Sequence, residues 1–232
     1  MATQTTGTNG EGAGREPGRT KARGGKNDVA DAAKGAVTIS PANLLIAEFE
    51  VIGETPLVMN AWGHKIDGMI ENQRDPRNKN RKKKPRDFAA DYENAKHIST
   101  DGWIGLPAAA FRAAMISACR IAGYAMTRAK LSAFVLADGV DRLDGVGLVR
   151  VYGEPRPMTH PVRNESGVAD VRSRPMWDEW RVKLRVRYDA DQFSVADVAN
   201  LLNRAGLQVG VGEGRNDSKK SAGVGWGSFR LA

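Results

Sequence analysis

Four cations at alternate positions form the pattern in this sequence with the clearest chemistry. Between residues 181 and 188 they alternate with apolar side chains, and they are Arg181, Lys183, Arg185 and Arg187. Strict alternation predicts a β-strand with one buried face and one solvent face. A row of cations binds phosphates, because neutralising them releases condensed counterions. The sequence therefore predicts a strand whose outer face contacts a nucleic-acid backbone.

A glycine-rich, basic segment follows between residues 210 and 227. We expect its glycines to let the backbone approach a polyanion closely. The glycines assigned this role are Gly210, Gly212, Gly214, Gly223 and Gly225, and the cations beside them are Arg215, Lys219 and Lys220. A dinucleotide fingerprint would have to open a helix, whereas this segment is expected to lead into a strand, and the Gly-Lys-Ser/Thr of a Walker loop is absent. A glycine loop without a ligand is the alternative.

Further basic residues are assigned to the same surface. A charge run with two prolines, residues 75 to 86, predicts a mobile loop, and its Lys82, Lys83 and Lys84 are expected on a flap over the nucleic acid; a plain solvated flap is the alternative. A hairpin predicted over residues 158–162 and 168–174 adds Arg172 and Arg174. Trp226 has glycine on both sides, so we expect it to be unburied and to stack on a base.

The sequence offers little for catalysis or metal binding. The three histidines, His64, His97 and His160, lack metal-ligand spacing, and no Ser or Cys nucleophile stands in a recognisable elbow. The single cysteine, Cys119, lies in an apolar helical pattern and is expected to be buried. His64, beside a tryptophan, is the better candidate for a general base, and His97 is expected at the surface. We therefore predict no catalytic residue, no cofactor and no metal.

Composition is consistent with a nucleic-acid partner. The 232 residues are 41% hydrophobic, with a formal charge of +8 and a pI near 9.7, a balance that favours polyanions; ordinary solubility charge is the alternative. Residues 1–36 have almost no large apolar side chains and predict a disordered arm. Residues 37–232 predict one domain with an insertion at 61–98. No run reaches membrane-spanning length, so we expect a cytoplasmic protein with no membrane contact.

The order of predicted elements indicates the fold class. Strands are expected over residues 44–53, 102–106, 131–136, 147–152, 181–188, 207–211 and 228–231, and helices over 88–97, 108–122 and 194–206. With the hairpin and the insertion set aside, this order predicts an α+β fold with a ferredoxin-like (RRM-like) β-α-β-β-α-β core.

Two C-terminal motifs resemble a known group of proteins. Residues 201–215, Leu-Leu-Asn-Arg-Ala-Gly-Leu-Gln-Val-Gly-Val-Gly-Glu-Gly-Arg, and residues 223–229, Gly-Val-Gly-Trp-Gly-Ser-Phe, resemble the RAMP superfamily of CRISPR-associated RNA-binding proteins. The resemblance implies that the glycine loop approaches RNA and that residues 61–86 correspond to the insertion of backbone subunits. Residues 51–59 are similar to the opening of uncharacterised bacteriophage proteins, which implies a bacterial host cell. The chain is shorter than usual backbone subunits.

These observations lead to one functional prediction and two alternatives. We expect a non-enzymatic, sequence-tolerant protein that binds single-stranded RNA or DNA and assembles along the strand as a homo-oligomer or filament. One alternative is a metal-independent endoribonuclease of the same superfamily that uses His64 or His97. The other is a structural adaptor whose basic surface meets an acidic protein.

Overall fold

The computed structural model describes residues 39–74, 86–163, 169–218 and 223–232. The predicted disordered arm, residues 1–36, lies outside the described residues. From Pro41 to Ala232 the chain forms one compact unit.

This unit contains a large sheet. Every strand pairing in it, among the described residues, is antiparallel. Its strands are β1 (Leu44–Gly53), β3 (His97–Ile98), β4 (Ile104–Pro107), β5 (Ala133–Leu136), β6 (Gly139–Val140), β7 (Gly147–Tyr152), β10 (Arg181–Asp189) and β11 (Phe229–Leu231). They lie in the order β11-β1-β10-β7-β4-β3, with β5 also on β10 and β6 on β7. The combination of helices with antiparallel strands confirms the predicted α+β class.

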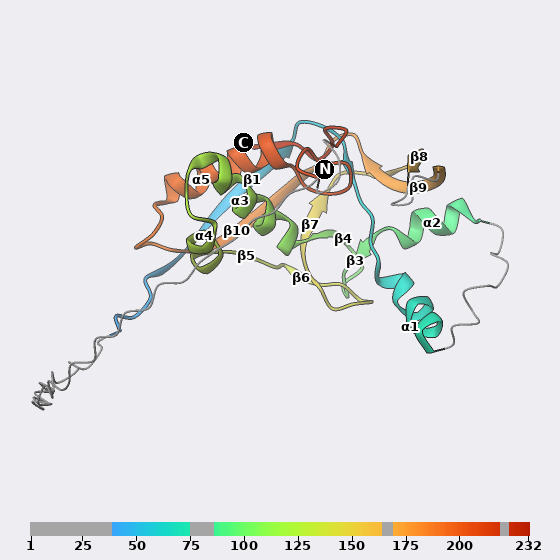
Figure 1. Ribbon diagram of the computed structural model, residues 1–232, viewed down its shortest axis with the longest axis horizontal. Helices are drawn as coiled ribbons and strands as arrows, with labels where there is room; N and C mark the ends of the chain where they lie inside the picture. The colour runs from blue at the N-terminus through green and yellow to red at the C-terminus, as the bar shows by residue number, and fades with distance from the viewer. Residues whose placement is uncertain (1–38, 75–85, 164–168, 219–222) are drawn as a thin grey trace, which may run out of the picture. The chain divides into compact units, whose positions relative to one another are not determined.

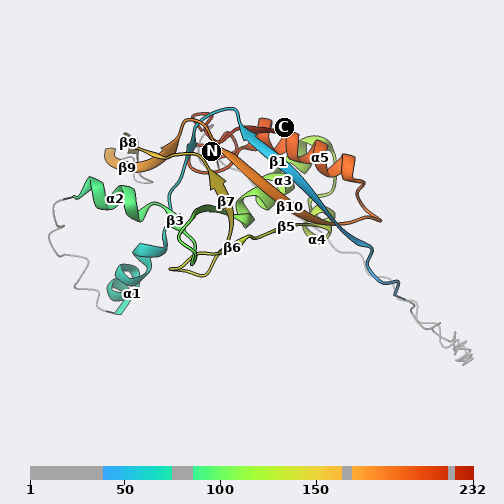
Figure 2. The same cartoon turned by 180° about the vertical axis from the view of Figure 1, so that it is seen from behind.

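Two helices cover one face of the long strands. The first is α3 (Ala108–Ala122), which ends at Gly123 with φ 69°, and the second is α5 (Val195–Arg204). α5 begins with the predicted cap, because the Ser194 hydroxyl accepts a hydrogen bond from the Asp197 amide and the Asp197 carboxylate accepts one from the Ser194 amide. Figure 1 shows these helices in front of β1 and β10, and Figure 2, from behind, shows both strands with no helix before them.

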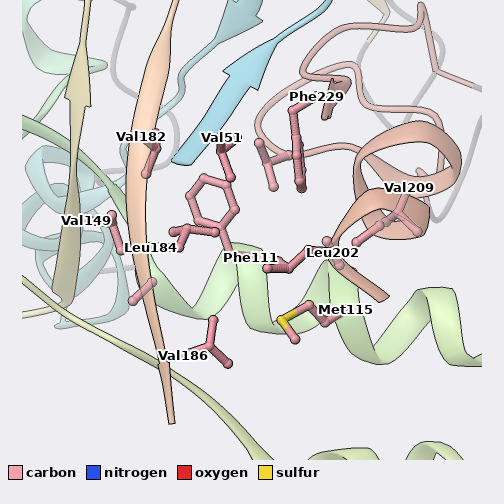
Figure 3. Close-up of a cluster of buried hydrophobic side chains, with 14 of the residues drawn as sticks. Val51, Phe111, Met115, Val149, Val182, Leu184, Val186, Leu202, Val209 and Phe229 are labelled. Carbon is pink, nitrogen blue, oxygen red and sulfur yellow. The ribbon is translucent and has the colours of Figure 1, made fainter. Parts of the chain in front are cut away.

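The core lies between the sheet and these helices. Val182, Leu184 and Val186 of β10 are fully buried and point toward Phe111 and Met115 of α3 (Figure 3). Burying such side chains stabilises the fold by about 1.5–3 kcal/mol each. The period-two pattern of β10 therefore sets which face of the sheet receives the helices. It also leaves the intervening cations on the opposite face.

A smaller antiparallel sheet joins β2 (Leu57–Val58), β9 (Ala169–Trp177) and β8 (Arg156–Arg163) in the order β2-β9-β8. The hairpin of β8 and β9 was predicted. α2 (Phe88–Asn94) packs on β9. Residues 63–74 form a 3-10 turn, η1 (Gly63–Lys65), followed by α1 (Ile66–Arg74), where the sequence predicts no helix. The predicted basic flap, with Lys82, Lys83 and Lys84, lies outside the described residues.

Two predictions about elements are wrong. Residues 207–211 do not form a strand, since α5 continues into a π-helix, Ala205–Val209, that buries Ala205 and Val209. A helix fits there because Gly206 lies against β11: a side chain at Gly206 would place its Cβ 1.8 Å from the Phe229 carbonyl oxygen. Residues 131–132 belong to α4 (Met126–Ser132) rather than to the predicted strand.

In the described part of the chain, every helix is too short or too polar to cross a membrane.

Candidate nucleic-acid interface

The four cations of β10 lie on the sheet face that the helices leave open. Arg181, Lys183 and Arg187 are exposed and Arg185 is half-buried. Among the described residues, the side chains of Arg181 and Lys183 have no hydrogen-bond or ion-pair partner. These side chains therefore form the row that the alternation predicts, and the described residues leave Arg181, Lys183 and Arg187 exposed. That they contact nucleic acid stays a prediction.

Neighbouring strands add side chains to this row. Tyr152 of β7 pairs with Arg181 of β10 and is 42% exposed, and the Arg150 guanidinium lies 5.2 Å from the centre of its ring. A shallow cleft of about 340 Å³ runs over Arg150, Tyr152 and Lys183. We call this surface the basic sheet face, and its members are Arg150, Tyr152, Arg181, Lys183, Arg185 and Arg187.

Carboxylates limit the positive charge of the basic sheet face. In the β1–β10 register, Glu50 lies opposite Lys183 and Glu48 lies opposite Arg185. Arg185 is further held by the carboxylate of Asp138, at 3.3 Å, and by the Ala137 carbonyl, at 3.0 Å. Arg181, Lys183 and Arg187 are consequently better placed than Arg185 to meet an external anion.

The glycine turn, residues 210–218 and 223–227, is a loop as the sequence predicts, and the expected approach of its glycines to a polyanion stays a prediction. Its glycines have positive φ angles, and most of them closely approach other parts of the protein. A Cβ at Gly212 would lie 2.5 Å from the Val58 carbonyl oxygen, and one at Gly223 would lie 2.0 Å from that of Arg215. A Cβ at Gly214 would lie 2.5 Å from the Trp226 ring, and one at Gly210 would lie 3.2 Å from the Trp226 and Gly227 carbonyl oxygens. Positive φ angles and contacts within the fold therefore account for these glycines without a ligand.

The glycine turn also lies on the other side of the main sheet from the β10 cations. Arg215 is exposed and lies beside Ala110 and Ala114 of α3, the helix that packs on the buried face of β10. Gly225 is half-buried, at the side of the turn near Asn216. The structure therefore does not bring Arg215 together with the basic sheet face. Lys219 and Lys220 lie outside the described residues.

The other described side chains that were predicted to contact nucleic acid are partly or fully buried within the protein. Arg174 is only 5% exposed, and its Nε lies 3.0 Å from the Glu213 carboxylate, so it holds the glycine turn to β9. Arg172, on the same strand, is half-buried. Trp226 is half-buried, with its ring 5.5 Å from that of His160, which corrects the expectation that nothing packs on it.

A second cleft, which the sequence does not predict, lies on the helix side. It has a volume of about 330 Å³, and its polar and aromatic lining consists of Asn60, Trp62, His97, Glu213 and Arg215. Met59, Leu106, Pro107, Ala110 and Gly212 complete it. We call it the helix-side cleft.

His97 is buried in the wall of the helix-side cleft, although a surface position was predicted. Its Nδ1 lies 2.7 Å from Oδ2 of Asp141, a carboxylate that is 4% exposed. Such a contact orients the ring and leaves Nε2 as the nitrogen available to a ligand. The two residues are 44 positions apart, with Asp141 in a turn-rich segment, so no local spacing signals the pair.

The same region contains the only group of possible metal ligands among the described residues. His97, Asp141 and Asp144 each offer one atom within 4.8 Å of the others. Both Asp141 oxygens already accept hydrogen bonds, from His97 and from the Leu143 amide, and Asp144 accepts one from the Val146 amide. These hydrogen bonds account for the placement of the two carboxylates.

His64 is half-buried beside Lys65. Burial, and then the charge of Lys65, lower the pKa of His64. Its Nδ1 has no partner among the described residues. No carboxylate of the described residues is hydrogen-bonded to it as Asp141 is to His97. The ranking of His64 above His97 as a candidate base stays a prediction.

No protein-family model matches this chain, and no curated protein matches it significantly.

Proposed function

We propose that the protein binds single-stranded nucleic acid on the basic sheet face, without strong sequence preference. The observation that carries the proposal is the uncovered row of Arg181, Lys183 and Arg187 beside the exposed ring of Tyr152. Cations along a strand neutralise successive phosphates, and an aromatic ring stacks on any base. Neither contact distinguishes one base from another, so the expected binding is sequence-tolerant.

The topology supports a ferredoxin-like core as part of this proposal. In chain order β1, α3, β7, β10, α5 and β11 form a β-α-β-β-α-β unit, and β11-β1-β10-β7 is their order in the sheet. Its first and third strands are thus central, and both helices lie on one face. RRM domains have such a sheet and bind single-stranded RNA on its open face. Membership of the RAMP superfamily remains the proposal that the C-terminal motifs suggest.

A salt titration tests the proposal. We expect the double variant Lys183→Glu/Arg187→Glu to weaken binding to a mixed-sequence single strand and to flatten the slope of log affinity against log salt by about 1.4, since each phosphate contact contributes about 0.7. The matched control is Arg128→Glu/Lys130→Glu, which makes the same charge change at exposed positions of α4. If both variants lose affinity and slope equally, net charge and not the basic sheet face binds the strand.

The oriented His97 supports a second candidate, the metal-independent endoribonuclease. Nε2 of His97 would take the proton of a 2′-hydroxyl, whose oxygen attacks the adjacent phosphorus; the bond to the 5′ oxygen breaks, that oxygen takes a proton, and a 2′,3′-cyclic phosphate remains. We expect labelled RNA in EDTA to give discrete fragments that His97→Ala abolishes and His64→Ala retains. Intact RNA after incubation with the unaltered protein would exclude this activity.

A further inference from the structure

The helix-side cleft has the size and position of a separate small-ligand site. Four segments that are distant in sequence build it: the chain after β2, the β3–β4 pair, the first turn of α3 and the glycine turn. Its volume of about 330 Å³ is within the range of small-molecule sites. It opens beside α3, whereas the basic sheet face lies on the other side of the main sheet. A ligand in it would not touch the β10 cations.

One polar atom in its wall lacks the partner that its burial requires. Oδ1 of Asn60 is buried and has no hydrogen-bond partner among the described residues. Asn60 directly follows Met59, whose amide donates to the Pro175 carbonyl, so the backbone at this position is fixed. A carboxamide offers one acceptor and two donors on a plane, the combination that pairs with the edge of a nucleobase.

Trp62 supplies an exposed aromatic surface at the same cleft. Its side chain is 56% exposed, and Lys65 Nζ lies 4.9 Å from the centre of its ring. Indole rings stack on every base. The Lys65 ammonium stays close to the ring, where it can meet the phosphate of a stacked nucleotide.

The charge around the cleft favours an anion. Arg215 is exposed, and the contact found for its guanidinium is the Gly212 carbonyl, at 3.2 Å. The acid in the wall, Glu213, is already paired with Arg174. Burial, followed by the charges of Arg174 and Arg172, lowers the pKa of Lys65. A phosphate nearby would relieve this crowding of like charges.

We infer that the helix-side cleft binds one nucleotide, with the base stacked on Trp62, its edge hydrogen-bonded to Asn60 and the phosphate held by Arg215 and Lys65. His97, fixed by Asp141, presents Nε2 as a further polar contact for the sugar or phosphate. This site goes beyond strand binding at the basic sheet face, and neither site requires the other.

Calorimetric titration with small ligands tests the inference. The probes are adenosine 5′-monophosphate, uridine 5′-monophosphate, adenosine and inorganic phosphate. We expect saturable binding of both nucleotides, with weaker binding of adenosine and of phosphate, because each carries only part of the contacts. Trp62→Ala, at an exposed position, should keep the circular dichroism spectrum of the unaltered protein and should weaken nucleotide binding about tenfold or more.

The controls separate this site from the basic sheet face. Lys183→Glu/Arg187→Glu should leave nucleotide affinity unchanged, whereas Arg215→Ala should reduce it. Equal affinity for phosphate and nucleotides would mean an anion site only and would overturn the inference. It is overturned equally if neither nucleotide binds saturably by ~10 mM, or if Trp62→Ala binds them as the unaltered protein does. Binding of single-stranded nucleic acid by the basic sheet face is tested separately, by the salt titration.

Discussion

Gly227, at the end of the glycine turn, illustrates how a glycine-rich segment can make the predicted close approach to a different neighbour. Its φ is 71°, and a side chain there would place Cβ 1.8 Å from the carbonyl oxygen of Val211. The Gly227 carbonyl in turn accepts a hydrogen bond from the Val211 amide. The glycine-rich composition indicates a backbone that must approach something closely. It does not indicate whether the neighbour is a ligand or the chain itself, because that depends on how residues far apart meet.

The contrast between Gly227 and Gly225 makes this point testable. Gly225 also has a positive φ, 84°, but the nearest atom to an added Cβ is Asn216 Oδ1, at an ordinary 3.6 Å. We expect Gly225→Ala to lower the free energy of unfolding by about 1–2 kcal/mol, the cost of the backbone conformation alone. Gly227→Ala adds a clash with backbone and should lower it by more than about 3 kcal/mol.

Denaturant unfolding of the two variants measures both values. Equal losses would mean that the turn moves freely enough to accept a side chain at Gly227. In that case the positive φ angle alone, and not the close backbone contacts, would be what requires glycine at position 227.

At the scale of elements, local patterns in the sequence predict strands and helices well where one face is buried. The alternation of β10 predicts both its extent and its exposed cations, and the i, i+3, i+4 spacing with Ser194 predicts α5. Where tertiary contacts decide, local patterns fail. Val209 reads equally as strand or helix in a short apolar run, and the position of β11 against Gly206 favours the helix.

The candidate sites follow the same division. The basic sheet face could be predicted because one strand carries most of it. The helix-side cleft could not, since Asn60, His97 and Arg215 come from different elements and only folding brings them together. Arg174 was predicted as a phosphate contact from its charge alone, but its burial against Glu213 gives it a structural role. Charge in a sequence indicates what a side chain can bind, and burial decides whether it is free to do so.

At the scale of the molecule, the two proposed sites lie on opposite sides of the main sheet. The affinity for a single-stranded nucleic acid should therefore depend on its length. A short oligonucleotide can occupy the basic sheet face or the helix-side cleft but cannot span both. A strand long enough to pass around the sheet can occupy both at once. The second contact is then intramolecular, and its effective concentration raises the overall affinity.

We therefore expect affinity, measured by fluorescence anisotropy at fixed salt over a series of oligonucleotide lengths, to rise by about tenfold or more between two successive lengths. Trp62→Ala should remove this step and leave the affinity for the shortest strands that bind the basic sheet face unchanged. Lys183→Glu/Arg187→Glu should weaken binding at every length.

The protein is kept in trace amounts relative to the nucleic-acid strand, so that assembly of several copies of the protein along one strand cannot produce the step. A smooth rise of affinity with length that is the same for the unaltered protein and Trp62→Ala would show that a nucleic-acid strand engages the basic sheet face alone. A second site on the far side of the sheet must add to the affinity abruptly, at the length that first reaches it.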